Sequence, residues 1–355
     1  MRTAFLDRVD ELNDPIQLAD RILRAALFLH ASDIHLDPME NHLRVRFRID
    51  GELEDVLEIK SSMQNALASR LKVLSSLDIA ERRAPQDGGF TWRLPGSSMA
   101  NTPLDVRMAT LPVRHGERIT LRLLETGGKR LTLDDLGMSV KDRALFDSVL
   151  RRPHGLVLLT GPTGSGKTTT LYAAIQALLK TGPKNIVTVE DPIEYEIPGV
   201  AQAEVDSADK VNFSKALKSL LRHDPDVVMI GEIRDADSLD VAIKAALTGH
   251  LVLSTLHTND AKGAVTRLVD MGLDPKLIGA VLRLAVAQRL VRRICTSCNG
   301  KGCSSCSNRG YSGRIGIFEF YSPDGENLRT MRDDAMEKVQ EGVTSLAEIE
   351  KALGE

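Results

Sequence analysis

A glycine-rich loop between an apolar strand and an apolar-spaced helix constrains this chain more than any other feature. It lies within 158-LLTGPTGSGKTTTLYAAI-175, and residues 161–168 fit the spacing G-x-x-x-x-G-K-[ST]. Glycines at these positions let backbone N–H groups turn toward an anion, and the N-terminus of the following helix favours negative charge. The loop therefore predicts a phosphate-binding site.

The residues predicted to contact a nucleotide run through the loop into the first turn of the helix: Gly161, Pro162, Thr163, Gly164, Ser165, Gly166, Lys167, Thr168 and Thr169. Within this set, Lys167 is expected to reach the β- and γ-phosphates and Thr168 to hold Mg²⁺. The loop alone does not show which process the nucleotide drives, because kinases, helicases, GTPases and motors all have such a phosphate-binding loop.

The composition excludes some classes of partner. The 355 residues include 46 Lys and Arg against 49 Asp and Glu, a formal net charge of −3, so nothing global indicates binding to nucleic acid or to an anionic membrane. No apolar run approaches the ~18 residues of a membrane span. The start, MRTAFLDRVDELNDP, carries acidic residues where a signal peptide would be apolar, so we expect a cytoplasmic chain.

The first part of the chain predicts a small α+β domain. Asn13-Asp14-Pro15 marks a helix start, and apolar residues at three- and four-residue spacing carry this helix to about His30. Apolar residues alternate with arginines over 43–49, and Asp50-Gly51 follows as a two-residue hairpin turn. The other predicted elements are a return strand over 52–59, a helix over 61–76 and strands over 104–110 and 117–124. Gly127-Gly128-Lys129 predicts the linker out of this domain.

From about Leu136 the pattern changes to alternating strands and helices. Apolar strands are predicted over 155–160, 185–190, 227–231 and 251–257, with helical patterns between them. This order is typical of a mainly parallel sheet with helices on both faces. A helix is predicted from about Lys276 to Arg293, leading into a cluster of cysteines, and a short helical tail follows.

Three strand ends in this second part predict catalytic groups. In 226-DVVMIGEIRD-235, Gly231 occupies the position of the usual aspartate, so Glu232 is the acid left to polarise attacking water. In 188-TVEDPIEYE-196, Glu190 leads a cluster of carboxylates expected to hold metal-bound water. His257 ends a strand next to the expected γ-phosphate, where it could sense that group. The alternatives are solvated strand-end carboxylates and a histidine that only makes core hydrogen bonds.

All four cysteines fall within twelve residues, as Cys295-x-x-Cys298 and Cys303-x-x-Cys306. Such a cluster suits a metal site in a reducing compartment better than disulfides spread over a secreted fold. Four thiolates satisfy tetrahedral Zn²⁺, and because every coordination position is then filled by sulfur, the site is expected to be structural. The alternative is four reduced thiols without a metal.

These motifs together resemble those of a known family. GPTGSGKTTTLY, VEDPIEYE, LRHDPDVVMIGEIRD and GHLVLSTLHTNDAKGAVTRL resemble the Walker A, Asp box, Walker B and His box of the secretion ATPases, the motors of type II secretion, type IV pilus assembly and DNA uptake. The stretches 31-ASDIHLDP-38, 46-RFRIDGEL-53 and 85-PQDGG-89 are similar to that family's regulatory domain. The resemblance covers almost the whole chain from Ala31 onward.

The resemblance implies a RecA-like α/β domain with a parallel sheet, preceded by a smaller α+β, PAS-like domain and followed by a small tetracysteine zinc subdomain. It also implies a hexameric ring with ATP between the N-terminal and RecA-like domains. Arginines of the N-terminal domain approach the γ-phosphate in this family, and the positions that match are Arg107 and Arg122, expected at opposite ends of one hairpin. Relatives usually separate the two cysteine pairs by a long loop, whereas here only Asn299 to Gly302 intervene.

The expected domains are a helical segment over 1–30, the α+β regulatory domain over 31–126, a linker over 127–138, the ATPase domain over 139–290, the metal subdomain over 291–320 and a helical tail over 321–355. The predicted function is a motor that hydrolyses Mg-ATP and drives protein secretion or pilus assembly through inner-membrane platform proteins, with which a cytoplasmic ring associates peripherally. A DNA-uptake motor remains open as an alternative. A RecA-like nucleic-acid motor is less favoured, because one Trp and a negative net charge do not suit a strand-tracking groove. A non-hydrolysing scaffold is disfavoured by Lys167, Thr168 and Glu232.

Overall fold

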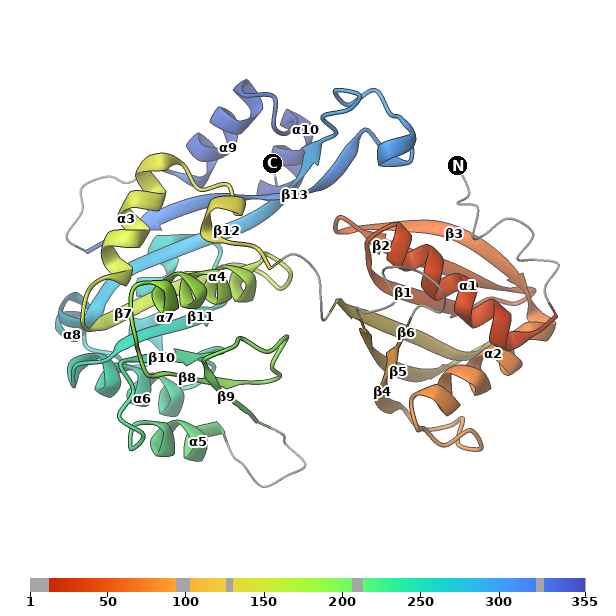
Figure 1. The fold of residues 1–355 in the computed structure, drawn as a ribbon, viewed down its shortest axis with the longest axis horizontal. Helices are drawn as coiled ribbons and strands as arrows, with labels where there is room; N and C mark the ends of the chain where they lie inside the picture. Colours follow the sequence, from red (N-terminus) through yellow and green to blue (C-terminus); the bar gives the residue numbers. More distant parts are fainter. Residues whose placement is uncertain (1–12, 94–102, 126–129, 206–212, 324–328, 355) are drawn as a thin grey trace. The chain divides into compact units, whose positions relative to one another are not determined.

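The chain divides into two units, residues 1–129 and 130–355, each with its own sheet (Figure 1). The computed structural model describes residues 13–93, 103–125, 130–205, 213–323 and 329–354. In this described part of the chain, no helix is both long and apolar enough to cross a membrane. Gly127-Gly128-Lys129, the predicted linker, lies outside the described residues.

The first unit is an antiparallel sheet covered by two helices. Its elements are α1 (Pro15–Phe28), β1 (Ala31–Pro38), β2 (His42–Ile49), β3 (Glu52–Lys60), α2 (Ser61–Leu74), β4 (Gln86–Trp92), β5 (Leu104–Val113) and β6 (Gly116–Glu125). The six strands follow the order β3-β2-β1-β6-β5-β4. Apolar residues of both helices and of the alternating strands share one core. The predicted α+β domain is confirmed.

Two strands of this unit had not been predicted. β1 carries Asp33, His35 and Asp37 between its apolar residues, yet all three are at most 9% exposed. β4 contains Gly88 and Gly89, which weaken any strand signal. Both strands form because they pair with neighbours on the sheet, β1 with β2 and β6, and β4 with β5. This pairing cannot be read from the local sequence.

The second unit is built on a seven-stranded, mainly parallel sheet. Its strands are β7 (Gly155–Thr160), β8 (Ile186–Glu190), β9 (Ala201–Glu204), β10 (Val227–Ile230), β11 (Leu251–Leu256), β12 (Leu282–Ile294) and β13 (Tyr311–Tyr321), in the order β13-β12-β7-β11-β10-β8-β9. Among the described strands of this sheet, β13 runs antiparallel to β12 and the other neighbours are parallel. The strand order confirms the predicted parallel sheet.

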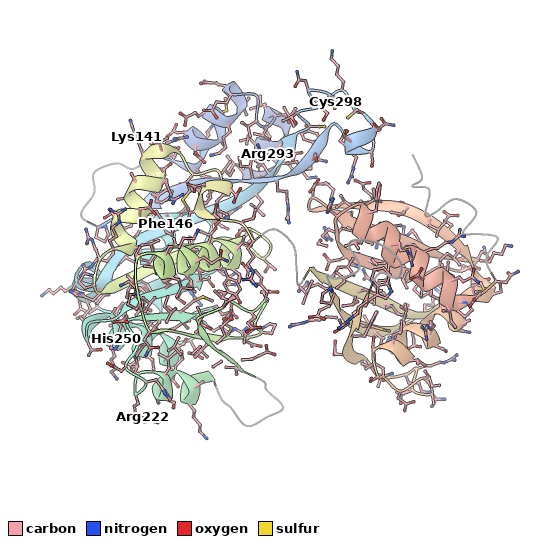
Figure 2. The ribbon with its side chains drawn as sticks, in the orientation of Figure 1. Lys141, Phe146, Arg222, His250, Arg293 and Cys298 are labelled. Carbon is pink, nitrogen blue, oxygen red and sulfur yellow. The ribbon has the colours of Figure 1, made fainter. Side chains whose placement is uncertain are left out.

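Helices cover both faces of this sheet (Figure 1). The helices are η2 (Leu133–Asp135), α3 (Val140–Leu150), α4 (Lys167–Lys180), α5 (Phe213–Leu220), α6 (Ala236–Leu247), α7 (Ala261–Asp270), α8 (Pro275–Val281), η3 (Ser304–Cys306), α9 (Met331–Gln340) and α10 (Leu346–Leu353). One core contains α3 and α4 with one face of the sheet, and another contains α5 to α8 with the opposite face. Figure 2 shows the labelled Phe146 of α3 within the first of these layers.

The predicted helix from Lys276 to Arg293 is wrong. The short α8 ends at Val281, and the chain continues as β12, the second strand of the sheet from the β13 edge. Residues 284–288 are buried without interruption, as expected for a strand covered on both faces. Its leucines, alanines and arginines have good helix propensity, but pairing with β7 and β13 overrides that preference.

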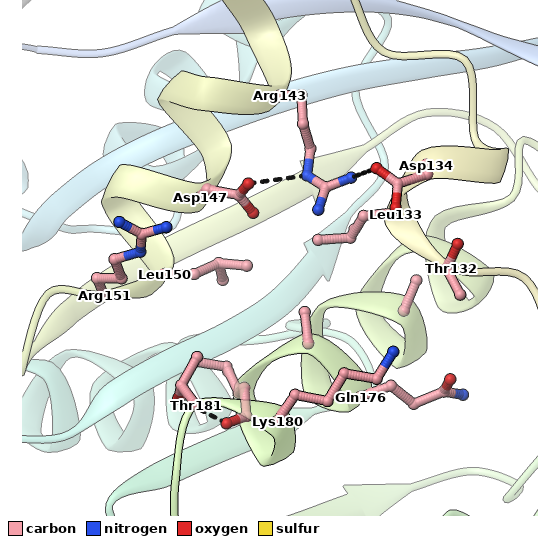
Figure 3. Close-up of a pocket in the computed structure, with 13 residues that line it drawn as sticks. Thr132, Leu133, Asp134, Arg143, Asp147, Leu150, Arg151, Gln176, Lys180 and Thr181 are labelled. Carbon is pink, nitrogen blue, oxygen red and sulfur yellow. Dashed lines mark hydrogen bonds and ion pairs between the residues drawn. The ribbon is translucent and has the colours of Figure 1, made fainter. Parts of the chain in front are cut away.

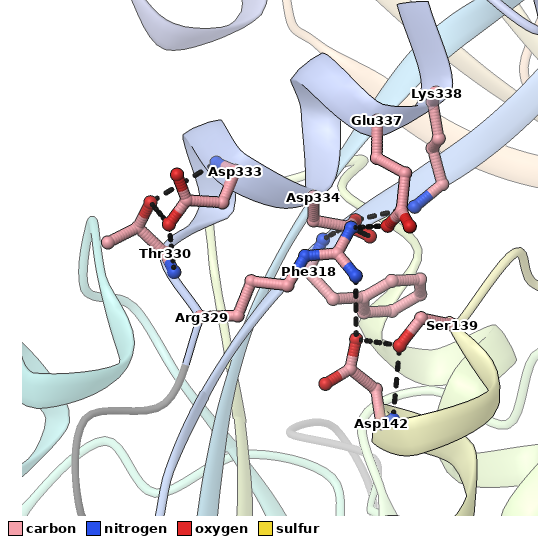
Figure 4. A network of polar contacts seen from close by, with 9 residues as sticks. All are labelled: Ser139, Asp142, Phe318, Arg329, Thr330, Asp333, Asp334, Glu337 and Lys338. Atoms are coloured by element: carbon pink, nitrogen blue, oxygen red, sulfur yellow. Dashed lines mark hydrogen bonds and ion pairs between the residues drawn. The ribbon is translucent and has the colours of Figure 1, made fainter. Parts of the chain in front are cut away.

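A buried ionic network fixes α9 against the sheet (Figure 4). The carboxylate of Asp334 accepts bonds from Lys338 Nζ at 2.5 Å, from Arg329 Nη2 at 2.8 Å and from the backbone N–H of Phe318 at 2.8 Å. Burial raises the pKa of Asp334, although the two cations oppose that shift. Arg329 also lies 3.9 Å from Asp142 of α3, so the network ties α9 to both β13 and α3.

Candidate functional site

The glycine-rich loop follows directly on β7, whose residues are all buried. Gly161, Gly164 and Gly166 have φ of +148°, +79° and +87°, in the left-handed region where side chains are strained. A Cβ on Gly161 would lie 2.5 Å from the carbonyl oxygen of Gln288, and one on Gly166 would lie 2.8 Å from its Nε2. The loop therefore needs glycine at 161 and 166 both for its turn and for its close packing on β12.

Lys167 and Ser165 direct polar groups into this loop. Lys167 is 9% exposed and donates to the carbonyl oxygens of Gly161 at 2.8 Å and Pro162 at 3.1 Å. Burial lowers the pKa of Lys167, and Glu232 opposes this shift. The Ser165 hydroxyl is buried and has no hydrogen-bond partner among the described residues. A buried ammonium on neutral carbonyls and an unsatisfied hydroxyl fit an anion such as a nucleotide phosphate.

A small cavity next to the loop collects oxygen ligands. It has a volume of about 70 Å³, and Thr168 lines it together with Glu190, Asp191, Glu194 and Glu232. Hydroxyl and carboxylate oxygens are the ligands that Mg²⁺ takes in nucleotide sites. The residues present thus fit the predicted magnesium ion, and the cavity brings Thr168 and Glu232 together as expected. Glu196 is exposed and does not line this cavity.

Glu232 and His257 meet at the ends of two paired strands. Ser254 Oγ donates to the carbonyl oxygen of Ile230 at 2.7 Å, and Thr255 Oγ1 donates to that of Gly231 at 2.8 Å, which adds side-chain bonds to the backbone pairing of β10 and β11. Beyond these bonds, His257 Nε2 lies 3.3 Å from Glu232 Oε2. The two side chains predicted from separate motifs therefore form one pair.

Arg234 also contacts this pair. It forms an ion pair with Glu232 and donates to Asp191 Oδ2 at 3.2 Å. Its side chain is 60% exposed, while that of Glu232 is 23% exposed. Arg234 thus connects Glu232, after β10, with Asp191, after β8, and it restricts the rotation of the Glu232 carboxylate.

Glu190 lies in a different environment from its neighbours in the sequence. It is 2% exposed and accepts hydrogen bonds from Thr188 Oγ1 at 2.6 Å, from Gln202 Nε2 at 3.1 Å and from the Tyr172 hydroxyl. Burial raises the pKa of Tyr172, and the bond to Glu190 raises it further. The structure places Glu190 on the cavity wall with both oxygens engaged, so it supports the segment after β8 through buried hydrogen bonds.

Arg107 and Arg122 lie in the first unit on β5 and β6. Their expected placement at opposite ends of one hairpin is wrong, because the two residues are direct cross-strand partners. The turn between the strands lies equally far from both, and this register puts them side by side. Both are exposed, and Arg122 Nε donates to Asp33 Oδ1 at 3.3 Å. Asp33, buried on β1, is a contact that the sequence did not indicate.

Two residues of β12 next to the loop were missed. Gln288 is 1% exposed, and its Oε1 accepts from Thr170 Oγ1 in the first turn of α4 at 2.8 Å. Arg289 Nη2 donates to the carbonyl oxygen of Asn259 at 2.9 Å. The sequence pattern does not single out either residue, because it predicts a helix over this segment. A glutamine and an arginine within the apolar run 284–291 were the available signal.

The four cysteines form a compact cluster in the connection between β12 and β13; Figure 2 labels Cys298 within it. Their sulfur atoms all lie within 4.8 Å of one another, and three recorded Sγ–Sγ separations are 3.8–3.9 Å. Four sulfurs at about 2.3 Å from a tetrahedral zinc ion are about 3.8 Å apart. The backbone N–H groups of Cys303 and Gly310 both lie 3.3 Å from Cys306 Sγ, as suits a thiolate. The donor set fits Zn²⁺.

A second, larger cavity has a volume of about 300 Å³ and lies among η2, α3 and α4 (Figure 3). Arg143, one of the cations that line it, is paired with Asp134 and, at 3.0 Å, with Asp147. None of the residues predicted for the nucleotide or metal sites lines this cavity. The larger of these two cavities is therefore not the one that contains the predicted catalytic residues.

Comparison with known proteins points to one group. The family model described as "Type II/IV secretion system protein" matches residues 10–351. Type II secretion system protein HxcR of Pseudomonas aeruginosa is 46% identical, over 94% of this chain and 76% of the relative. Type II secretion system ATPase E of Vibrio cholerae is 42% identical, over 96% of this chain and 75% of the relative.

Solved structures show the same fold. The Legionella pneumophila ATPase DotB superposes with a TM-score of 0.74 at 22% identity, covering 95% of each chain. The pilus retraction motor PilT, solved with bound ADP, superposes with a TM-score of 0.64 at 27% identity, covering 94% of this chain and 96% of its own.

Proposed function

The chain belongs to the type II/IV secretion system protein family and is an ATP-hydrolysing secretion motor, and from that premise we propose that it energises type II secretion or the assembly of a type IV pilus or pseudopilus. A motor of a DNA-uptake pilus is the second candidate, because the same motifs serve that machine. The observation that carries the proposal is the shared cavity in which Thr168 of the phosphate loop faces Glu232 beside His257.

The proposed roles follow from these contacts. Lys167, held on neutral carbonyls, exchanges them for the β- and γ-phosphate oxygens of ATP, since charged acceptors make the stronger bonds. Thr168 would hold Mg²⁺, which would supply positive charge to offset that of the phosphates. Glu232 orients and polarises the attacking water, and His257 senses the γ-phosphate through its contact with Glu232. Glu190 keeps the acidic segment after β8 in place.

Arg107 and Arg122 are proposed to stabilise charge on the departing phosphate. Support comes from their exposure and their direct pairing, which put two guanidinium groups on one patch of the first unit. An arginine that acts in this way can be worth several orders of magnitude in rate. We further propose that the active species is a homo-hexamer that works on inner-membrane platform proteins, with no direct nucleic-acid ligand.

The tetracysteine cluster is proposed to bind one structural Zn²⁺ through Cys295, Cys298, Cys303 and Cys306. The sulfur separations and the N–H groups directed at Cys306 support it. We also propose the domain limits 1–30, 31–126, 127–138, 139–290, 291–320 and 321–355. The boundary between the two units, at Lys129, lies inside the proposed linker and supports that limit, whereas β12 crosses the limit at 290 and β13 the limit at 320 as strands of one sheet.

A direct test measures ATP hydrolysis by the purified chain with Mg²⁺, with and without single-stranded DNA. We expect Mg-dependent turnover that DNA leaves unchanged, and its loss in Lys167→Ala, because that variant lacks the cation for the β- and γ-phosphates. Stimulation by DNA would favour the nucleic-acid motor. Tight ATP binding without any turnover, in the presence of partner membranes as well, would favour a non-hydrolysing scaffold.

A further inference from the structure

Arg289 of β12 reaches from the sheet to the loop that begins at His257, the residue proposed to sense the γ-phosphate. β12 pairs with β7 in the register Ala287 to Thr160, so Arg289 follows just where β7 gives way to the glycine-rich loop. Its Nη2 donates to the carbonyl oxygen of Asn259 at 2.9 Å, and its Nη1 donates to that of Gln288 at 3.2 Å. Asn259 lies two residues after His257.

The His257 loop, residues 257–260, is attached to the sheet at few points. Thr258 N–H donates to Thr160 Oγ1 at 2.8 Å, and Asp260 caps α7 through Gly263 N–H at 2.6 Å. His257 itself has a side chain 52% exposed and contacts Glu232. Thr258 Oγ1 also donates to the carbonyl oxygen of Asp260 at 2.9 Å, and among the described residues Arg289 donates to the carbonyl oxygen of Asn259 between them.

Arg289 is suited to this connection because its recorded partners are neutral. Burial lowers the pKa of Arg289, and Asp260 and Glu319 oppose this shift. Both carboxylates accept bonds from backbone N–H groups of α7, Asp260 from Gly263 and Glu319 from Ala261. The guanidinium group thus donates to two carbonyl oxygens, to that of Asn259 through Nη2 and to that of Gln288 through Nη1. It also lies against the phosphate loop, since a Cβ on Gly161 would be 3.2 Å from Nη1. A lysine offers one charged nitrogen and cannot span both acceptors in this way.

We propose that Arg289 is a positioning residue for the hydrolysis of ATP: it holds the His257 loop against the first glycine of the phosphate loop, so that His257 and Glu232 keep their contact during turnover. This inference rests on the role proposed above for His257. Loosening the loop should impair the chemical step while leaving most nucleotide contacts intact, because the phosphate loop and Lys167 are untouched.

The competing explanation is that Arg289 is simply a second cation near Lys167, which attracts phosphate by charge. Two substitutions separate the explanations. Arg289→Lys keeps the charge and removes the two-ended fork, whereas Arg289→Ala removes both. The matched control is Arg283→Ala, which shortens another half-buried arginine of β12, near the opposite end of β7, where Leu282 pairs with Leu156.

The experiment measures kcat and KM for Mg-ATP in the full chain, with thermal melting to verify folding. For Arg289→Ala and Arg289→Lys alike, we expect kcat to fall by at least about tenfold and KM to stay within about twofold, with Arg283→Ala close to wild type. In a His257→Ala background, adding either change at 289 should cost little more, because both act through the same side chain. Deuterium exchange should rise over residues 257–260 in both Arg289 variants.

Several results would overturn this inference. Full kcat in Arg289→Lys, or a large rise of KM in Arg289→Ala with kcat retained, would favour the simple cation. Additive losses with His257→Ala would mean that Arg289 acts elsewhere. If His257→Ala alone turns over at the wild-type rate, the role proposed for His257 fails together with the inference. If Arg289→Lys is no more impaired than the control Arg283→Ala, the proposed ATPase function stands and only the positioning role of Arg289 is rejected. Should Arg289→Ala not fold, Arg289→Lys carries the test.

Discussion

Glu232 is restrained on two sides, by the ion pair with Arg234 and by His257 Nε2 at 3.3 Å. A carboxylate held in this way presents a fixed lone pair to water instead of sampling several rotamers. Gly231 and Glu232 both line the cavity with Thr168, and of these two neighbours Glu232 supplies the carboxylate.

We predict that Glu232→Gln keeps ATP bound and hydrolyses it at least about a hundredfold more slowly, because an amide cannot act as a general base. Binding of a fluorescent ATP analogue and steady-state phosphate release measure the two properties. Glu196→Gln is the matched control, since Glu196 belongs to the same acidic stretch and lies outside the cavity. Wild-type turnover in Glu232→Gln would move the general base to Glu190.

Residue types were predictable from the sequence, whereas their surroundings were not. The spacing of the glycine-rich loop and the acids at strand ends located Lys167, Thr168 and Glu232, because strand ends of a parallel sheet meet at one edge. Nothing local distinguished Glu190 from Asp191, yet Glu190 is bonded on both oxygens inside the sheet. Burial of a carboxylate depends on distant partners such as Tyr172 and Gln202.

At the scale of elements, strands with one clear pattern were found and β12 was not. β7 matches its predicted limits because a continuous apolar run ends at a glycine turn. β12 has the same buried character, but its alanines and arginines equally suit a helix. Only its partners, β7 and β13, decide between the two structures. Because a helix is predicted over this segment, the sequence does not indicate that Gln288 and Arg289 lie beside the phosphate loop.

The connection between β12 and β13 should depend on its metal. We predict one Zn²⁺ per chain by elemental analysis, and a lower zinc content with reduced melting temperature in Cys298→Ser, because structural zinc contributes folding free energy directly. Each kcal/mol lost should lower the midpoint by roughly 2–4 °C in a unit of this size.

Ser305→Ala controls for this change, because Ser305 is exposed in η3, between Cys303 and Cys306 of the same cluster. Both variants should keep the fold of the sheet, as measured by circular dichroism. Zinc-free wild-type protein with four freely reactive thiols would reject the metal site.

At the scale of the whole molecule, we predict that turnover depends on assembly. Specific activity should rise with protein concentration as hexamers form, which light scattering and ATPase assays on the same samples can follow. Arg122→Ala should lower turnover far more than ATP affinity, because its charge matters most as the phosphate leaves. Arg44→Ala, on β2 of the same unit, is the control. Constant specific activity from dilute to concentrated protein, with an unimpaired Arg122→Ala variant, would contradict this prediction.

The course of β12 determines how a movement at the phosphate loop can reach the cysteine cluster. It passes Gln288 and Arg289 beside the phosphate loop and reaches Ile294 next to Cys295, so a single extended segment of about 20 Å joins the two places. Beyond Ala287 it pairs with β13, and Arg292 is clamped by Glu348 of α10 at 2.9 Å. Pairing with β13 stiffens this segment as far as Arg292, where the register shifts before Ile294, so we expect a small displacement at its loop end to move the cysteine cluster as one body. A spectroscopic label at the exposed position of Arg293, marked in Figure 2, would report this movement.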